Sequence, residues 1–469
     1  MTRPTPIVDV LIVGAGLAGL SAANRAAELG LVVRVLEAGE TELYACNSRI
    51  SGGLFHITMD DMVRPTDDIV ASIARITRNE GVPALASALG GRARFAIDWL
   101  REQGVTFMKA GPDGLRKFSL APPRVRRTGL HWRGRAGDVM LRTLIDALKR
   151  RGGRIDLGHE VLRLVMRAGR CEGVIVRHNG VEREIQARAV VLCDGGFQAD
   201  RDLLAEFVTT APERLLMRNA RTGRGSGIRM ARAVGAQLVG MSAFYGHLHH
   251  RDAMADEGLW PFPVLDSLAT AGILVGSDGS RFCDEGLGGI NASNAIARLP
   301  DPLSTHLIFD EAIWKGPGQN WLLPANPYLL SAGGTIVSAP SIAELAARLS
   351  VPPDLLTATV ERYNSALQTG EQLAVPRTRS LYQPWPINKG PFHAVPVCPG
   401  ITYTMGGILT DEKAQVLDDN GLPIEGLLAA GATTGGLEGG TFTGYSGGLS
   451  KASVFGIIAA ETLAASLAP

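Results

Sequence analysis

The chain is poor in cysteine, with five among its 469 residues. They are scattered along the sequence, and no two of them have a CxxC spacing: Cys46, Cys171, Cys193, Cys283 and Cys398. An odd and dispersed set argues against a disulfide framework and against a zinc site. We therefore expect a reducing compartment, the cytoplasm, and no metal centre.

The chain also lacks an excess of charge of one sign and a long apolar run. Lys and Arg total 47 against 46 for Asp and Glu, a formal net charge of +1, so nothing global attracts nucleic acid or an acidic membrane. The longest apolar candidate, Val454–Ala460, stops at Glu461, well short of a membrane span. The N-terminus (MTRPTPIVDV) lacks the apolar core of a signal peptide. We expect neither a nucleic-acid partner nor a membrane span.

Glycine is what the sequence has in excess. It supplies 57 of 469 residues, about 12% where ~7% is average. Because there is no Gly-X-Y period, these glycines must serve local turns and close backbone approaches. The hydrophobic fraction of 45% and the charged fraction of 20% are those of a globular protein.

The N-terminal segment predicts a dinucleotide-binding βαβ unit. An apolar run at 8–13 leads into Gly14-Ala15-Gly16-Leu17-Ala18-Gly19, an amphipathic stretch follows to Leu29, and a second apolar run covers Val32–Leu36. In this motif Gly14 permits the tight turn, Gly16 the approach of a pyrophosphate, and Gly19 close helix packing. Glu37 then stands where an acid binds the ribose hydroxyls, which favours a dinucleotide without a 2′-phosphate. The alternative is a βαβ turn that is merely tight.

The rest of the chain predicts an α/β fold with two domains. Helices are expected at 137–151, 341–349 and 353–367, a hairpin around Asn179-Gly180, a strand at 189–192, and strands with a closing helix in the last 70 residues. Residues 241–335 are rich in aromatics and proline and show little clear period. We predict a nucleotide-binding domain formed by 1–242 and 403–469, with a second domain, 243–402, inserted between them.

Several glycine-containing motifs appear in one order along the chain. They are Asn47–Gly53 (NSRISGG), Cys193–Phe197 (CDGGF), Thr222–Ile228 (TGRGSGI), Thr404–Gly407 (TMGG) and Gly426–Gly431 (GLLAAG). Together they resemble the fumarate reductase/succinate dehydrogenase flavoprotein superfamily over nearly the whole chain. Ile401–Gly407 and Phe442–Gly456 are most similar to its tricarballylate dehydrogenase branch. The resemblance implies a Rossmann-like FAD-binding domain of the glutathione reductase type with an inserted α+β capping domain.

The resemblance further implies extended, non-covalently bound FAD. The helix that starts near Gly447-Gly448 is expected to point its N-terminus at the flavin N1/O2 edge, where it would stabilise the anionic reduced flavin. Ala432 replaces an acid that is often found there, so a ribityl contact is lost. The residues expected to bind FAD are Gly14, Gly16, Ala18, Gly19, Glu37, Ala38, Asn47, Ser48, Gly52, Gly53, Val161, Asp194, Gly195, Gly431, Ser446, Gly448 and Leu449.

The chain departs from the fumarate reductases of this superfamily at their catalytic positions. Gly289 stands where the proton-donating arginine is expected, Tyr403 replaces the histidine before Thr-Met-Gly-Gly, and the glycine-rich segment 439–450 contains no cation. Tyr403 and Tyr445 are therefore the candidate acid–base residues, by analogy with 3-ketosteroid dehydrogenases. His247 is a third candidate. For both tyrosines the alternative is that the hydroxyl caps backbone while the ring packs.

Substrate-binding candidates come from three segments. Residues 116–135 contain seven Lys or Arg and no acid, so Arg126, Arg127 and His131 could clamp a carboxylate. A solvated basic loop is the simpler interpretation of that cluster. Phe442 and Gly289 are expected at the same seam between the domains.

These residues predict an FAD-dependent oxidoreductase acting on a CH–CH bond, by desaturation or by ene reduction. The small-molecule substrate would be activated by a carbonyl or a carboxylate, for example a tricarballylate-like polycarboxylate. One alternative is a ketosteroid-dehydrogenase-like enzyme for an apolar cyclic ketone, and another is a non-catalytic electron-transfer subunit. No second GxGxxG motif serves a nicotinamide, so the electron acceptor is expected to be a quinone, oxygen or a partner protein.

Overall fold

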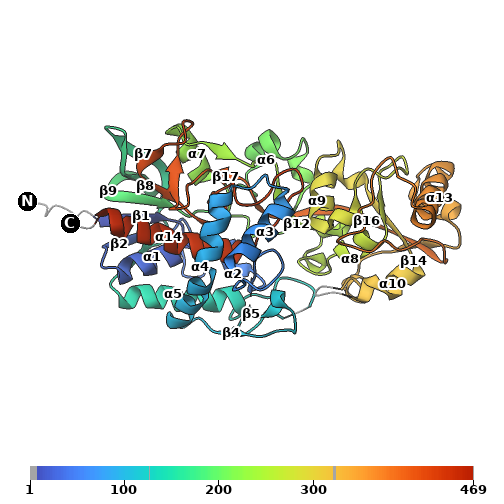
Figure 1. Ribbon diagram of the computed structural model, residues 1–469, viewed down its shortest axis with the longest axis horizontal. Helices are drawn as coiled ribbons and strands as arrows, with labels where there is room; N and C mark the ends of the chain where they lie inside the picture. Colours follow the sequence, from blue (N-terminus) through green and yellow to red (C-terminus); the bar gives the residue numbers. More distant parts are fainter. Residues whose placement is uncertain (1–7, 126, 321–323, 468–469) are drawn as a thin grey trace, which may run out of the picture.

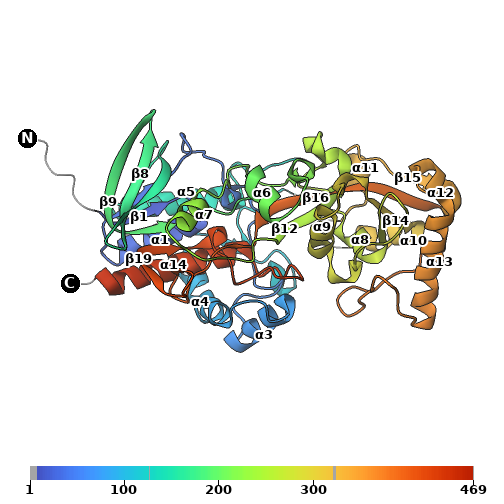
Figure 2. The ribbon, with the colours of Figure 1, turned by 90° about the horizontal axis from the view of Figure 1, so that it is seen from above.

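The computed structural model describes residues 8–125, 127–320 and 324–467. The molecule is elongated, with a sheet in each of two lobes (Figure 1). The first strand and the last helix belong to the same lobe, whereas residues from the middle of the chain form the other lobe (Figure 2). The described chain therefore leaves the first lobe and returns to it.

An eight-stranded sheet forms the first lobe. Its order is β18-β19-β9-β1-β2-β6, and the β7–β8 hairpin pairs with β9. The central strand β1 is parallel to both β2 and β9. The strands are β1 (Val8–Val13), β2 (Val33–Leu36), β6 (Arg154–Asp156), β7 (Glu160–Arg167), β8 (Arg170–His178), β9 (Val181–Leu192), β18 (Gln415–Leu417) and β19 (Pro423–Ala429).

Helices pack on this sheet because its central strand is buried on both faces. Alternate residues of β1 enter two cores, with Val10 and Ile12 facing the helical side. There Gly456 of α14 lets this helix approach α1 closely, since a Cβ on Gly456 would lie 2.4 Å from the carbonyl oxygen of Ala18. The helices of this lobe are α1 (Leu17–Glu28), α2 (Asn47–Ile50), α3 (Thr66–Thr77), α4 (Pro83–Glu102), α5 (Ala136–Arg150), α6 (Arg201–Phe207), α7 (Ser226–Ala233) and α14 (Gly448–Leu467).

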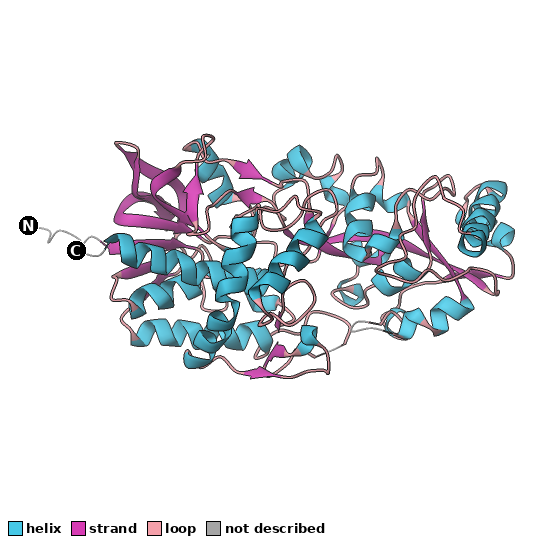
Figure 3. Ribbon diagram, in the orientation of Figure 1, coloured by secondary structure: helices cyan, strands magenta, loops and turns pink. Residues whose placement is uncertain are grey.

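A second sheet is built around one long strand, β16 (Phe392–Thr404), which pairs with four others. Its remaining strands are β10 (Leu216–Met217), β12 (Phe244–His250), β13 (Ile273–Val275), β14 (His306–Asp310) and β15 (Val337–Ala339). Helices pack around it with a separate core (Figure 3). They are α8 (Asp266–Ala271), α9 (Gly289–Ala297), α10 (Glu311–Lys315), α11 (Tyr328–Ser331), α12 (Ile342–Leu349) and α13 (Pro353–Thr369). Two small sheets are formed by β3 (Leu54–Phe55), β4 (Phe107–Met108) and β5 (Phe118–Leu120), and by β11 (Leu238–Val239) and β17 (Gly407–Ile408).

The sequence predicts much of this architecture. The α/β class is confirmed, as are the first βαβ unit, the hairpin at residues 179–180, and α5, α12, α13 and α14. Residues 241–335, which show little period, contain β12, α8, β13, α9, β14 and α10; these elements are short and largely buried, so no long amphipathic pattern marks them. The second sheet draws mostly on 243–402, but β10 precedes that range and β16 continues past it. The domain boundaries stay a prediction.

Candidate active site

A single cavity of about 770 Å³ is lined by residues of both sheets. On the side of the first sheet its lining includes Glu37 at the end of β2 and Val161 in β7. On the side of the second sheet it includes three tyrosines, Tyr245, Tyr403 and Tyr445. The predicted nucleotide motif and the predicted acid–base residues therefore line the same space.

The turn between β1 and α1 forms one wall of this cavity. Gly14 has a φ of +95°, and a Cβ there would lie 2.7 Å from the carbonyl oxygen of Cys193, so only glycine fits. The Glu37 carboxylate accepts hydrogen bonds from the N–H groups of Ala15 (2.9 Å) and Gly39 (2.8 Å). Gly16, Leu17 and Ala18 at the start of α1 line the cavity, and a helix N-terminus suits a pyrophosphate.

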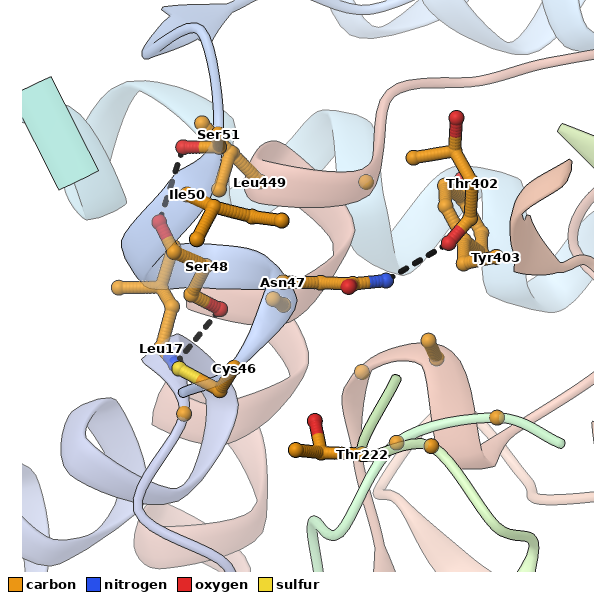
Figure 4. A pocket seen from close by; sticks show the side chains of 18 of the residues that line it. Leu17, Cys46, Asn47, Ser48, Ile50, Ser51, Thr222, Thr402, Tyr403 and Leu449 are labelled. Atoms are coloured by element: carbon orange, nitrogen blue, oxygen red, sulfur yellow. Dashed lines mark hydrogen bonds between the residues drawn. The ribbon is translucent and has the colours of Figure 1, made fainter. Parts of the chain in front are cut away.

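Helix α2 ties this turn to the second sheet. The hydroxyl of Ser48 accepts the N–H of Leu17 (3.0 Å), and the side-chain amide of Asn47 donates to the carbonyl of Thr402 (2.8 Å) (Figure 4). The Asn47 amide oxygen also accepts the N–H of Ala220 (2.9 Å). Asn47 thus lines the cavity while its polar atoms hold three chain segments together.

Asp194 contributes a buried carboxylate to the cavity. One oxygen accepts the N–H of Gly227 at the start of α7 (2.7 Å), and the other has no hydrogen-bond partner among the described residues. Burial raises the pKa of Asp194 to about 6. A ligand that donates a hydrogen bond here would satisfy the second oxygen.

The start of α14 forms the opposite wall. Gly448 and Leu449 line the cavity, and the Gly448 N–H donates to the Tyr445 hydroxyl (3.3 Å). Ser446 does not line the cavity, because its N–H and hydroxyl both donate to the buried carboxylate of Glu438 (2.9 and 2.7 Å). Gly19 is also absent from the lining, and a Cβ there would lie 1.9 Å from the Gly14 carbonyl oxygen.

The residues that are present fit FAD. All the predicted FAD-binding residues except Gly19 and Ser446 line the cavity. Two helix N-termini and the unsatisfied Asp194 oxygen supply donors and an acceptor for a dinucleotide. Burial raises the pKa of the lining thiol Cys46 to about 12, so it stays neutral near pH 7 and is a weak nucleophile for covalent attachment.

Three tyrosine rings meet at the inner part of the cavity. The rings of Tyr245 and Tyr445 stack with centroids 3.9 Å apart and an interplanar angle of 17°. Tyr403 lies 5.6 Å from Tyr245 and 6.2 Å from Tyr445. Burial raises the pKa of each phenol.

Tyr245 differs from the other two tyrosines in its hydrogen bonds. Its hydroxyl lies 2.9 Å from Nε2 of His247, and Nδ1 of that histidine lies 2.7 Å from the Asp266 carboxylate. A carboxylate only accepts, so Asp266 holds the proton on Nδ1 and leaves Nε2 free to accept from Tyr245. Burial raises the pKa of Tyr245, and the charge of Asp266 raises it further, while Arg218 and the Tyr445 hydroxyl act to lower it.

Tyr403 is bonded differently. Its hydroxyl donates to the carboxylate of Glu438 (2.9 Å), which also forms an ion pair with Lys451 (3.3 Å). Burial, and then the negative charge of Glu438, raises the pKa of Tyr403. Tyr403 therefore gives up its proton less readily, and among the described residues it has no neutral base beside it comparable to His247.

Of the predicted substrate-binding residues, the four that the structure describes do not line the cavity. Arg126 lies outside the described residues. Arg127 is exposed, with Nη2 3.0 Å from Nδ1 of His131. Phe442 stacks under Arg78, 3.1 Å from Cζ to ring centroid, and Gly289 packs against Asp266 in the wall of the second lobe.

Three residues that the sequence did not identify as site residues line the cavity: Tyr245, Arg124 and Arg218. A fourth, Glu438, lies behind Tyr403 and accepts its hydroxyl. Arg124 belongs to the basic segment 116–135, from which the sequence suggests Arg126, Arg127 and His131 as the substrate-binding residues. Tyr245 shares a strand with His247 at a spacing of two, which places both on one face of β12. That spacing was a usable signal.

One described helix, α14, is long and apolar enough to cross a membrane by length and composition. Of its most apolar window, 67% is buried inside the protein. It packs against α1 in the first lobe, as a core helix does.

Comparison with known proteins places the chain in a family. The family model described as FAD binding domain matches residues 9–449. The chain is 29% identical over 450 residues to the NADH:fumarate oxidoreductase of Klebsiella pneumoniae (strain 342), an alignment that covers 93% of this chain but 45% of that protein. It is 28% identical to a fumarate reductase (cytochrome) of Shewanella frigidimarina, over 99% of this chain and 78% of that one.

Other similar proteins act on oxo compounds by name. The 4-oxocyclohexanecarboxylate 2-dehydrogenase of Sinomonas cyclohexanicum is 27% identical, over 98% of this chain and 93% of its own. The crystal structure of 3-ketosteroid Δ1-dehydrogenase from Sterolibacterium denitrificans has the same fold, with a TM-score of 0.77 at 22% identity over 98% of this chain and 100% of that one. The tricarballylate dehydrogenase branch stays a prediction. The chain belongs to the FAD binding domain family, in the fumarate reductase/succinate dehydrogenase flavoprotein superfamily of FAD-dependent oxidoreductases.

Proposed function

We propose that this enzyme removes or adds hydrogen across a CH–CH bond next to a carbonyl group, and that Tyr245 moves the α-proton. The observation that carries the proposal is the row of hydrogen bonds from Tyr245 through His247 to Asp266, which begins in the cavity. Bound FAD supplies the two-electron hydride acceptor or donor.

The hydrogen bonds from Tyr245 through His247 to Asp266 allow a balanced proton transfer. In dehydrogenation the Tyr245 oxygen takes the α-proton while its own proton passes to Nε2 of His247. The resulting imidazolium is stabilised by Asp266, whose other oxygen accepts the N–H of Leu248 (2.9 Å). In reduction the same protons move in reverse. Tyr403 donates to Glu438, so we assign it to positioning rather than to proton transfer.

The relatives support a carbonyl-activated substrate. Two of the similar proteins carry the names of dehydrogenases for oxo compounds. The lining of Trp260, Pro261 and Phe262 gives the second-lobe side of the cavity an apolar surface suited to a ring. Fumarate reduction is less well served, because Gly289 stands where its proton-donating arginine is expected and Tyr403 replaces the histidine that binds a substrate carboxylate.

The test is a comparison of tyrosine variants under anaerobic conditions. Cyclic ketones should bleach the flavin of the parent enzyme, and Tyr245→Phe should slow the bleaching by about 100-fold or more. Tyr363→Phe is the matched control, since that buried hydroxyl bonds to backbone carbonyls away from the cavity. FAD content and reduction by dithionite should be equal in all three proteins. A Tyr245→Phe rate within twofold of the parent would refute the assignment.

The acceptor and the compartment also belong to this proposal. All five cysteines, each within the described ranges, are free, which supports a reducing compartment such as the cytoplasm. We propose a quinone, oxygen or a redox protein as the electron acceptor. Stopped-flow reoxidation of the reduced flavin by each of them in turn would identify which one reacts.

A further inference from the structure

Two guanidinium groups line the substrate side of the cavity with donors that have no partner. Arg124 uses Nη1 to bond the carbonyl of Ile50 (3.0 Å), and Arg218 uses Nη1 to bond the hydroxyl of Thr402 (2.8 Å). Nε and Nη2 of Arg124 and Nε of Arg218 are buried without a hydrogen-bond partner among the described residues. Buried donors left in this way are costly, so a ligand is expected to use them.

The positive charges of Arg124 and Arg218 also lack a neighbouring counter-charge. No described carboxylate lies within ion-pair distance of either guanidinium, whereas the buried guanidinium groups of Arg49 and Arg281 each have one. Burial, and then the positive charge of Arg218, lowers the pKa of Arg124 to about 10. Asp266 is the carboxylate whose charge acts on the pKa of Arg218, and both of its oxygens are already engaged by His247 and Leu248. Two uncompensated cations in one cavity call for an anion.

The position of the pair assigns that anion to the substrate rather than to the cofactor. Arg218 is close enough to Tyr245 and Tyr445 for their charges to act on its pKa. Arg124 lies over the ring of Phe262, 5.5 Å from its centroid. The pyrophosphate is expected instead at the N-terminus of α1, where Gly14, Gly16 and Ala18 line the cavity.

We propose that Arg124 and Arg218 form a carboxylate-binding subsite, so that the substrate carries a carboxylate in addition to the reacting carbonyl. Nε and Nη2 of one guanidinium present the parallel pair of donors that a carboxylate accepts. The substrate is then an oxo acid, with its apolar body against Phe262 and its carbonyl near Tyr245. This substrate class rests on the proposed function, but the subsite can be tested without turnover.

The binding test uses carboxylates that the enzyme has no carbonyl to act on. Cyclohexanecarboxylate is titrated into the FAD-loaded enzyme and followed by the change in flavin absorbance, beside its neutral amide, cyclohexanecarboxamide, and beside inorganic phosphate. The carboxylate should bind at least about tenfold more tightly than the amide. Equal affinities for the acid and the amide overturn the proposal, and preferential binding of phosphate overturns the choice of a carboxylate.

Variants of the two arginines test whether carboxylate binding depends on them. Arg124→Gln should weaken carboxylate binding about tenfold or more while leaving the amide unchanged, and Arg218→Lys, which keeps the charge, should weaken it less than Arg218→Gln. Arg133→Gln is the matched control, because this exposed arginine of the same segment stacks on Trp132. A loss of FAD in the Arg124 or Arg218 variants would mean that the pair binds the cofactor and would overturn the proposal.

The two proposals fail in different ways. Tyr245→Phe should bind cyclohexanecarboxylate as the parent does, since that variant keeps both guanidinium groups. If Tyr245→Phe reacts at the parental rate but Arg124→Gln loses carboxylate binding, the proton-transfer assignment is wrong and the subsite stands. If Arg124→Gln binds the acid as tightly as the parent, the subsite is wrong whatever Tyr245 does.

Discussion

Replacing Glu438 by glutamine should destabilise the enzyme far more than a change of one atom suggests. The carboxylate is buried in the wall of the cavity and accepts four hydrogen bonds. Tyr403 and Lys451 donate to one oxygen, and the N–H and hydroxyl of Ser446 donate to the other. Every neighbour is a donor, so the site requires an acceptor on both sides.

The magnitude follows from what a glutamine can accept. Its NH₂ group must face either Tyr403 and Lys451 or the two donors of Ser446, so two donors lose their acceptor in either orientation. The Lys451 ammonium also loses its counter-charge and keeps only the carbonyl of Thr434 (2.8 Å). Both side chains of the ion pair are at most 1% exposed. Removing one partner of such a buried pair costs about 3–5 kcal/mol.

Urea unfolding of the FAD-loaded enzyme, followed by circular dichroism and by flavin release, measures the loss. Glu438→Gln should lose about 3–5 kcal/mol, whereas Glu412→Gln at an exposed site should change stability by less than about 0.5 kcal/mol. The double variant Glu438→Gln/Lys451→Met removes both charges and should be more stable than Glu438→Gln alone. A single variant within about 1 kcal/mol of the parent would refute the reasoning, as would effects that simply add.

Three further outcomes concern single positions. Burial lowers the pKa of His56 to about 4, below its unfolded value near 6.5, so the unfolded chain binds this proton first and stability falls by about 3 kcal/mol as the pH drops from 6.5 toward 4. His56→Asn should flatten that part of a pH series of urea midpoints, and an unchanged slope would contradict the shift. Gly289→Ala puts a Cβ 2.1 Å from Cγ of Asp266, so anaerobic flavin reduction should slow as much as in Asp266→Asn at unchanged FAD content; a parental rate would show that Asp266 can move away without loss. Gly91→Ala, exposed within α4 with nothing within 4 Å of the new Cβ, should gain about 1 kcal/mol in thermal unfolding, and a loss would show that the helix needs glycine there.

The cofactor side of the site could be predicted because its determinants are local. Gly19 packs against the backbone of Gly14, five residues earlier, and Glu37 follows directly after the next strand. Such a turn requires glycine wherever two backbone segments are in contact, so the glycine spacing of the motif can be recognised in the sequence. Ser48 and Asp194 were found for the same reason, since each stands in or beside a glycine-rich motif.

The catalytic side could not be predicted as well, because its residues converge from distant segments. Arg218 follows β10, Tyr245 lies in β12 and Glu438 in the loop before α14, and no local period links them. The sequence nonetheless contains one feature that indicates the buried ion pair. Within the glycine-rich stretch 431–451, Glu438 is the sole acid and Lys451 the sole base, and a lone pair of opposite charges in such surroundings indicates a buried ion pair.

Gly288 and Gly289 connect the absence of the expected arginine with the proton path that we propose. They stand where the resemblance to fumarate reductases places the loop of the catalytic arginine. A Cβ on Gly289 would lie 2.2 Å from Oδ2 of Asp266, the oxygen that holds His247, and a Cβ on Gly288 would lie 3.0 Å from the ring of Tyr382. Any side chain at position 289 would therefore occupy the space of the carboxylate behind His247. An arginine at position 289 would displace Asp266 from His247, so the proposed proton path through Tyr245, His247 and Asp266 requires a residue without a side chain there.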